Sequence, residues 1–170
     1  MTDTMTPQQR HYCMSRIRSK DTTPEKRVRQ WLWKHGYRYR LNVKGVPGKP
    51  DIVMRKYRTA IFVNGCFWHG HNVALPRMED VGYKTEDVIA SSECCKIPKT
   101  NRDFWVAKIC RNKERDREDY RKLAAMGWHS ITVWECQLKP GKREDTLESV
   151  ANTLNQNWLQ DHLQTHSHIQ

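Results

Sequence analysis

Long apolar runs are absent from this sequence. Its 170 residues contain no stretch of 18 apolar residues, which excludes a membrane-spanning helix of ordinary length. The opening residues, MTDTMTPQQRHYC, include no apolar segment of the kind that a secretory signal requires. We therefore expect a cytoplasmic protein that has no membrane partner.

Internal repeats and low-complexity tracts are also missing, and no heptad pattern or long apolar patch marks a dimer interface. Hydrophobic residues make up 37% of the chain, which is enough for a modest core. A length of 170 residues suits one domain. The sequence therefore predicts a small monomeric protein built around a single core.

Acidic side chains are scarce, because 19 Asp and Glu stand against 30 Lys and Arg and leave a net charge of +11. Residues 8–44 hold eleven basic residues and only two acidic ones, whereas residues 72–98 contain five acidic residues and resemble a long insertion with little core. A basic excess gathered in one segment favours nucleic acid as the partner. The alternative is a surface that is basic throughout and merely soluble.

Periodic patterns predict an α/β fold. Thr22 or Thr23 can cap a helix that Gly36 ends, and Thr100 with Asp103 resembles a capping box for a later helix. The expected helices span 6–17, 22–36, 101–126 and 145–159, and the expected strands span 37–43, 51–55, 59–64 and 128–136. This order predicts a mixed β-sheet flanked by helices.

Asp51 follows a proline and opens a strand, so its carboxylate lies at a sheet end, where it can bind a hard cation such as Mg2+. The alternative is a solvated aspartate at the start of a strand. In many nucleases the next strand supplies a carboxylate and a lysine, but residues 62–64 are Phe, Val and Asn. A nuclease built on this pattern needs a different base, and His69 follows a few residues later; histidine is a side chain suited to general-base work near neutral pH.

The stretch FVNGCFWHGH places Cys66 and His71 on either side of His69. Zn2+ prefers four nitrogen or sulfur ligands in a tetrahedron, so two further ligands must come from elsewhere in the chain. Disulfides are not expected in a reducing cytoplasm, and Cys13 and Cys110 fit no ligand pattern. The alternative is that the cysteines bind no metal.

Five motifs follow one another between about Met14 and Leu138: PGKPDIV, FVNGCFWHGH, PKTNRDFW, NKERD and GWHSITVWEC. Together they resemble the very-short-patch repair (Vsr) endonucleases. The resemblance implies a restriction-endonuclease-like fold with a structural zinc site. It also implies an enzyme that nicks duplex DNA on the 5′ side of the thymine in a T·G mismatch left by deamination of 5-methylcytosine.

On this basis we divide the chain into three parts. Residues 1–20 are expected to form an N-terminal helix or arm that contacts DNA. Residues 21–140 are expected to form the endonuclease core, with 72–98 as an acidic insertion, and 141–170 a C-terminal helix and tail.

The resemblance assigns Mg2+ to the Asp51 carboxylate and to the backbone carbonyl of Val63. It gives His69 the role of activating the attacking water, with Asp116 orienting the imidazole, and it places Glu25 near the metal waters or the histidine. The alternative for Glu25 is a first-turn carboxylate that stabilises the helix dipole, and the alternative for Asp116 is a helix-surface ion pair.

Asn64 stands where the family often has a histidine. An amide can donate a hydrogen bond to a phosphate, but it cannot shuttle protons. The expected catalytic contribution of Asn64 is therefore limited to hydrogen bonding.

For zinc, the resemblance adds Cys136 after the last strand and a cysteine shortly after the histidine. The second of these is displaced here, because no cysteine follows His71 until Cys94 and Cys95. One of these two is expected to complete the site, with Cys94 slightly favoured. Such a Zn2+ is structural, with four protein ligands and no open position.

The resemblance also implies direct contact between side chains and bases. Aromatic residues enter the base stack from the major-groove side, a methionine enters from the minor groove, and two polar residues on one helix face read the mismatch. These residues are Phe67, Trp68, Trp105, Met14, Lys108 and Asn112. For any single aromatic residue, packing in the core is the alternative.

Two other functions compete with mismatch nicking. The same fold supports restriction-type endonucleases that cut both strands, and a zinc-stabilised DNA-binding module needs no catalysis. A module of that kind predicts the loss of Asp51 or His69, and both are present. The family acts before a DNA polymerase and benefits from mismatch-repair proteins, so these are expected partners beside T·G-mismatched DNA, with the protein at the nucleoid.

Overall fold

The structure is a computed structural model that describes residues 6, 8–9, 12, 15–16, 20–74 and 93–167. Half of the expected first helix, including Met14, and most of the acidic insertion lie outside the described residues. Among the described residues, no helix is long and apolar enough to cross a membrane.

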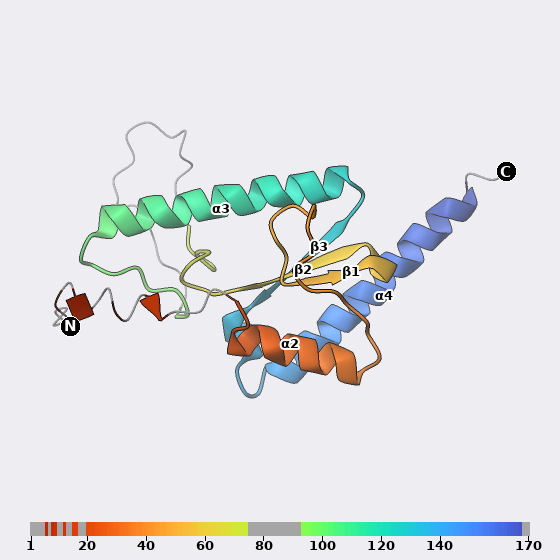
Figure 1. The fold of residues 1–170 in the computed structure, drawn as a ribbon, viewed down its shortest axis with the longest axis horizontal. Helices are drawn as coiled ribbons and strands as arrows, with labels where there is room; N and C mark the ends of the chain where they lie inside the picture. The colour runs from red at the N-terminus through yellow and green to blue at the C-terminus, as the bar shows by residue number, and fades with distance from the viewer. Residues whose placement is uncertain are drawn as a thin grey trace.

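Three strands and three main helices form the body of the molecule (Figure 1). The strands lie in the order β1-β2-β3, with β1 antiparallel and β3 parallel to β2. In Figure 1, α3 runs along one side of the sheet, while α2 and α4 lie on the other. The elements are α2 Thr23–Lys34, β1 Ile52–Met54, the 3-10 helix η1 Arg55–Tyr57, β2 Thr59–Asn64, α3 Arg102–Ala125, β3 His129–Trp134, the 3-10 helix η3 Glu135–Leu138 and α4 Arg143–Ser167.

Alternation along the central strand separates two cores. Ile61 and Val63 belong to a cluster with residues of α2 and α4, whereas Ala60 and Phe62 pack with Leu123 of α3. Successive side chains of a strand point to opposite faces, so the last side chain of β2 lies on the same face as Phe62 and points toward α3. A mixed sheet with helices on both faces is therefore confirmed.

The capped start of α2 is confirmed. Thr22 is the N-cap, and its hydroxyl and the Glu25 carboxylate form a reciprocal capping box. Val28 and Leu32 of this helix are fully buried against the sheet. The carboxylate that ends the first turn of α2 is thereby fixed relative to the strands.

Two expectations about local structure are wrong. Residues 37–43 do not form a strand, because Arg40 makes only an isolated bridge with Val53 and Asn42 turns the chain at a φ of 51°. The predicted capping box also does not form, because α3 begins one residue later, at an N-cap Asn101 with a φ of 53° and no side-chain cap bond.

The last helix is longer than its apolar pattern predicted. The expected range was 145–159, but α4 continues to Ser167 and its C-terminal half extends beyond the sheet in Figure 1. Leu147 and Leu154 are buried, whereas Leu159 and Leu163 are exposed. The C-terminal part of α4 therefore extends beyond the core that the rest of the helix covers.

A third core cluster contains both described ends of the acidic insertion. Val73 near its start and Cys95 and Ile97 near its end are buried with Val106 and Ile109 of α3. The expectation of little core does not hold for these ends. Their burial brings the chain back beside the stretch that carries Cys66.

Candidate active site and thiol cluster

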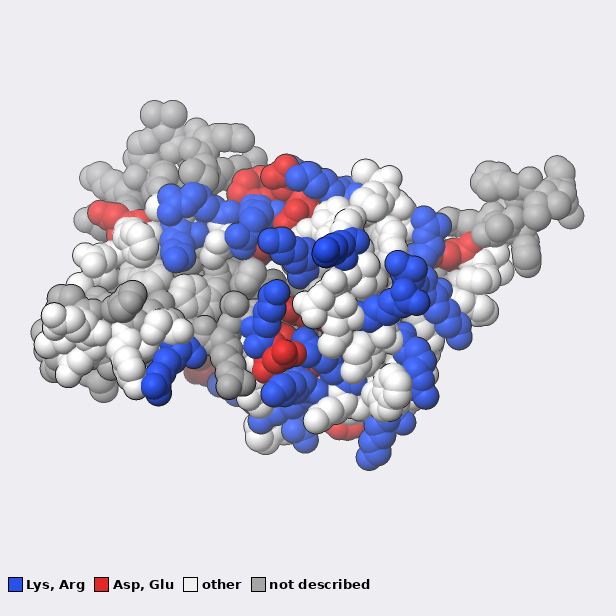
Figure 2. Space-filling model, viewed as in Figure 1, with Lys and Arg blue, Asp and Glu red and all other residues white. Residues whose placement is uncertain are grey.

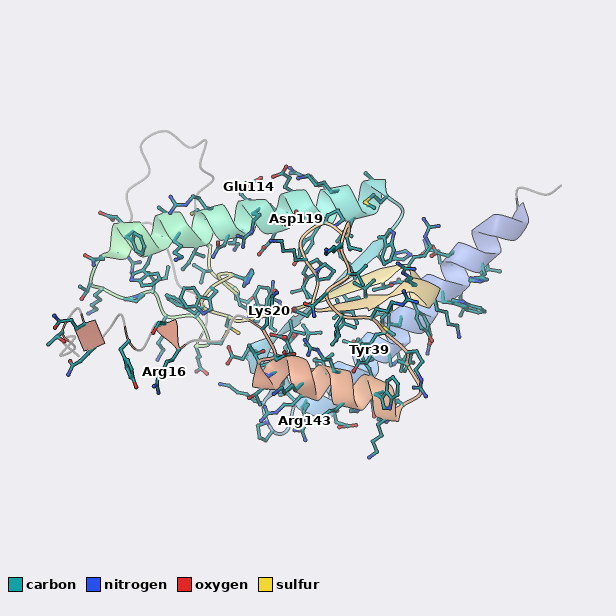
Figure 3. The ribbon with its side chains drawn as sticks, viewed as in Figure 1. Arg16, Lys20, Tyr39, Glu114, Asp119 and Arg143 are labelled. Carbon is teal, nitrogen blue, oxygen red and sulfur yellow. The ribbon has the colours of Figure 1, made fainter. Side chains whose placement is uncertain are left out.

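The residues expected to perform catalysis line one cleft of about 630 Å³. It lies where the N-terminus of α2, the ends of β1 and β2 and the middle of α3 meet. Figure 2 shows acidic atoms in a hollow between α2 and α3, with basic residues around it, and Figure 3 shows side chains of both helices pointing toward this space. The cleft is lined by Glu25, Asp51, Asn64, His69 and Asp116, together with Lys49, Lys108, Arg115 and Glu135 among others.

A close packing contact positions the start of β1. Gly48 has a φ of +75°, and a Cβ there would lie 2.9 Å from Phe62 and 3.1 Å from Asp119. Only glycine combines this conformation with such a close approach. The loop before Asp51 is therefore held directly against β2 and α3.

The Asp51 carboxylate reaches across to the neighbouring strand. The N–H of Val63 donates a 2.7 Å hydrogen bond to Asp51 Oδ2. Burial raises the pKa of Asp51 and Glu25 adds to the rise, while the Val63 bond, Arg29 and His69 oppose it. This carboxyl group is costly to ionise unless a cation accompanies it.

Glu25 is both a helix cap and a wall of the cleft. It is 4% exposed, its Oε1 accepts from the Thr22 hydroxyl at 2.7 Å, and its Oε2 accepts from Arg29 at 2.8 Å. The Asp21 N–H also donates to Oε2, at 2.9 Å. The capping alternative is therefore confirmed, and the same carboxylate lines the cleft that contains Asp51 and His69.

His69 and Asp116 form a pair. His69 Nδ1 lies 2.5 Å from Asp116 Oδ2, and the imidazole comes from the loop after β2 while the carboxylate comes from α3. Neighbouring charges on α3 form the surface pairs that the sequence suggested, Glu114 with Arg117 and Glu118 with Lys122. One oxygen of Asp116 lies 3.9 Å from the exposed Arg115, while the other meets His69 in the cleft, so a helix-surface pair accounts for only part of its contacts.

One turn of α3 also holds the backbone of that loop. Asn112 Nδ2 donates to the carbonyl of Trp68 at 2.8 Å, so this amide nitrogen is engaged by the protein itself. Lys113 Nζ donates to the carbonyls of Gly70 at 3.3 Å and Val73 at 2.9 Å. Burial lowers the pKa of Lys113. Sequence reasoning missed this lysine, because its run of charges looked like a solvated helix face.

Asn64 is 7% exposed and lies at the end of β2. A hydrogen bond with Asn64 lowers the pKa of the Tyr120 hydroxyl, although burial leaves that pKa raised overall. Tyr120 also lies 2.9 Å from the Thr132 hydroxyl. The amide is thus oriented by a buried polar group of α3 while it lines the cleft.

The aromatic residues expected at DNA gather beside the cleft. Ring centroids lie 5.1 Å apart for Phe67 and Trp68, 5.1 Å for Phe67 and Trp105, and 6.0 Å for Trp68 and Trp105. Lys108 Nζ lies 5.6 Å from the centre of the Trp68 ring. Phe104 joins the group and is 54% exposed, although sequence reasoning did not select it.

A second group of donors meets beside the same loop, which supplies two of its members, Cys66 and His71. The ligand atoms of Cys66, His71, Cys94 and Cys136 all lie within 4.8 Å of one another. His71 Nδ1 is 3.3 Å from the sulfur atoms of both Cys94 and Cys136, and its ring stacks on Trp134 at 4.1 Å. Three thiols and one imidazole can hold a metal ion, and this donor set fits Zn2+.

Burial shifts the pKa values of two side chains in this cluster. It raises the pKa of Cys66 to about 12 and lowers the pKa of His71. Cys95 is fully buried outside the cluster, with its sulfur 4.0 Å from the carbonyl oxygen of Phe67. The structure thus brings Cys94, rather than Cys95, to the other three donors.

Other cleft residues had no sequence pattern that singled them out. Lys49 precedes the Pro-Asp pair in a positive-φ conformation, at 52°, and Arg115 and Glu135 lie at the rim. Glu135 begins η3, between the end of β3 and Cys136. A rule that considers the neighbours of each expected ligand could have selected Lys49 and Glu135.

Comparisons with known proteins agree with the motifs. The family described as "DNA mismatch endonuclease Vsr" matches residues 2–75. A type II nicking enzyme of Neisseria meningitidis, V.NmeAIP, is 43% identical over 141 residues, which cover 82% of this chain and 86% of that protein. V.XorIIP of Xanthomonas oryzae is 41% identical over 81% of this chain and 88% of its own length. The DNA mismatch endonuclease Vsr of Escherichia coli is 36% identical over 146 residues, covering 86% and 80% of the two chains.

Proposed function

This chain belongs to the Vsr family of DNA mismatch endonucleases, and from that premise we propose that it nicks duplex DNA on the 5′ side of the thymine in a T·G mismatch. The observation that carries the proposal is a single cleft that combines a buried carboxylate, a histidine–aspartate pair and an adjacent aromatic cluster. This combination suits the hydrolysis of a phosphodiester beside a disturbed base step. The restriction-endonuclease-like fold is part of the same proposal.

Asp51 and the carbonyl of Val63 are the proposed ligands of Mg2+. The N–H of Val63 points to Asp51, and the N–H and C=O of one strand residue project to the same side. The carbonyl oxygen of Val63 and the Asp51 carboxylate therefore face the same end of the sheet. When bound, Mg2+ supplies positive charge to the phosphate and to the leaving oxygen.

His69 is the proposed general base. The Asp116 carboxylate accepts a hydrogen bond from Nδ1–H, which leaves Nε2 as the basic atom for a water proton. The Asp116 carboxylate also stabilises the imidazolium that forms. Glu25 is proposed to accept hydrogen bonds from metal-bound waters, and Asn64 to donate one to the phosphate.

The thiol cluster is proposed to hold a structural Zn2+ through Cys66, His71, Cys94 and Cys136. These residues come from the loop after β2, the far end of the insertion and η3. A bound ion would join these three segments. Its proposed function is to fix the loop on which His69 lies.

The proposed DNA contacts combine stacking and polar recognition. Insertion of side chains costs unstacking of a base step, on the order of a few kcal/mol, and a mismatched step costs less. Asn112 retains its carbonyl oxygen for a base while its Nδ2 holds the loop. The remaining proposed contacts are Met14, Phe67, Trp68, Trp105 and Lys108. DNA polymerase and mismatch-repair proteins remain proposed partners.

A nicking assay tests the function. One labelled duplex carries a central T·G in a CC(A/T)GG-like context, and its twin carries the matched C·G pair, with each strand labelled separately. We expect a Mg2+-dependent nick only in the thymine strand of the mismatched duplex. Cutting of both strands of the matched duplex would instead establish the restriction-type alternative.

The matched variant for this assay is Asp51→Ala. We expect it to bind the mismatched duplex and leave it intact. If the variant nicks as fast as the unchanged protein, the proposed role of Asp51 is wrong.

A further inference from the structure

A second groove, of about 740 Å³, lies on the other side of the loop that carries His69 and His71. Its charged side chains are Lys96, Lys139 and Lys142, with a single carboxylate from Glu93. Residues of the thiol cluster line it as well. Neither the proposed catalysis nor the proposed mismatch contacts use these lysines.

Among the residues that the structure describes, Glu93 is the only acid that lines this groove. Lys96, Lys139 and Lys142 are exposed, and none of them forms an ion pair with any other residue that the structure describes. A Zn2+ ion with three thiolates and one imidazole would carry a net charge of −1. Three lysines exceed that charge and Glu93 together, so the groove stays positive.

Neighbouring residues of one segment line the groove and the catalytic cleft. Glu135 of η3 lines the cleft, while Cys136 and Lys139 line the groove. Three residues lie between Glu135 and Lys139, so even a fully extended chain places their Cα atoms no more than about 14 Å apart. Along one strand of duplex DNA, that span corresponds to about four nucleotides at 3.4 Å each.

We propose that this groove binds the phosphodiester backbone of DNA on one side of the mismatch, within about four nucleotides of the nick. The proposal rests on the proposed function, because it assumes that the scissile phosphate lies in the cleft. An ammonium group attracts phosphate without reading sequence. The lysines therefore add affinity and fix the direction of the duplex, but they leave the choice of mismatch to other residues.

Equilibrium binding of an uncleaved duplex tests this proposal. The variant is Lys139→Gln with Lys142→Gln, and the control is Lys122→Gln, an exposed lysine of α3 that lines neither the groove nor the cleft. Affinities for mismatched and matched duplexes are measured without Mg2+ over a range of salt concentrations. Zinc content and thermal unfolding are measured for each protein.

We expect the double variant to bind both duplexes more weakly and by the same factor. The slope of log affinity against log salt should fall by about 0.9 for each lost phosphate contact, and so by up to about 2. Shortening the duplex on one side to fewer than four nucleotides from the mismatch should weaken binding by the unchanged protein. The same shortening should have little effect on the variant.

Two outcomes overturn the proposal. One is a zinc-loaded, folded double variant whose affinity and salt slope equal those of Lys122→Gln. The other is loss of zinc with an unchanged salt slope, which would mean that the lysines only balance the thiolates. Because the duplex stays uncut, a protein that fails to nick T·G DNA disproves the proposed function and leaves this binding test intact.

Discussion

One loop contributes residues to both the catalytic cleft and the thiol cluster, but the two sites contain different donor atoms. His69 faces oxygen donors in an open cleft, and His71, two residues later, faces sulfur donors beside a stacked Trp134. Hydrogen bonds orient the side chains of the cleft, whereas Cys66 of the cluster is held in a buried position. On the proposed function, we expect changes in the cleft to alter the nicking rate and changes in the cluster to alter the position of the loop.

The largest expected effect is on the cleft side. Asp51→Asn removes the proposed metal charge partner while it keeps the shape of the side chain. We expect nicking to fall by about 10³-fold or more, because a metal ion contributes several kcal/mol to this chemistry. Single-turnover nicking of the T·G duplex measures the effect.

The same variant sharpens the comparison through what it should leave unchanged. Zinc content and far-UV circular dichroism should match those of the unchanged protein. A simultaneous loss of zinc would show that the two sites are not separable.

The next effect concerns the cluster, where two adjacent cysteines provide a matched pair. We expect Cys94→Ala to lose the metal and at least about 3 kcal/mol of unfolding free energy, since metal binding contributes directly to folding. Cys95→Ala should keep the metal and lose only about 1 kcal/mol for a small cavity. Metal analysis and denaturant unfolding distinguish the two variants, and the reverse result would move Cys95 into the ligand set.

Asp116→Asn tests whether hydrogen bonding alone orients the cleft. The amide still reaches His69 Nδ1, but it no longer stabilises a charged imidazolium. We expect nicking to fall by about 10²-fold at saturating DNA, within the range of general-base effects, with unchanged DNA affinity. A rate equal to that of the unchanged protein would remove His69 and Asp116 from the proton-transfer step.

The smallest effect is the pH dependence of stability. Burial raises the pKa of Asp51, so the folded protein holds this proton more tightly than the unfolded chain does. The group therefore favours folding fully below its ordinary carboxyl pKa, and that contribution is lost as the pH rises through the raised value. In Mg2+-free, zinc-loaded protein, Asp51→Asn should flatten this part of the unfolding free energy. Denaturant unfolding across mildly acidic to neutral pH measures it, and parallel curves for both proteins would contradict the raised pKa.

Local chemistry made much of the fold predictable. The Thr22–Glu25 capping box and the Gly127 helix end depend on a few neighbouring residues, so the sequence contains their signals. The strand expected at 37–43 failed because alternation does not guarantee a pairing partner, and only Arg40 found one. Local signals were not sufficient everywhere, because the equally local capping box expected at Thr100 and Asp103 does not form.

The candidate site was predictable as a set of residues but not as contacts. The choice between Cys94 and Cys95 depends on which thiol turns into the apolar core, and adjacent residues differ in this only through tertiary packing. Lys113 was unpredictable for the same reason. Its carbonyl partners lie at least 40 residues away along the chain, so the charged residues around Lys113 in the sequence did not indicate these contacts.

The contacts of Lys113 also have an evolutionary consequence. They hold the carbonyls of Gly70 and Val73, the second of which lies at the start of the acidic insertion, and Cys94 lies near the end of that insertion. Residues can be gained or lost between Val73 and Cys94 across generations without displacing His69, provided that a thiol returns to the same point. In such an arrangement the position of a ligand in the fold is retained, while the number of residues between it and the other ligands can change.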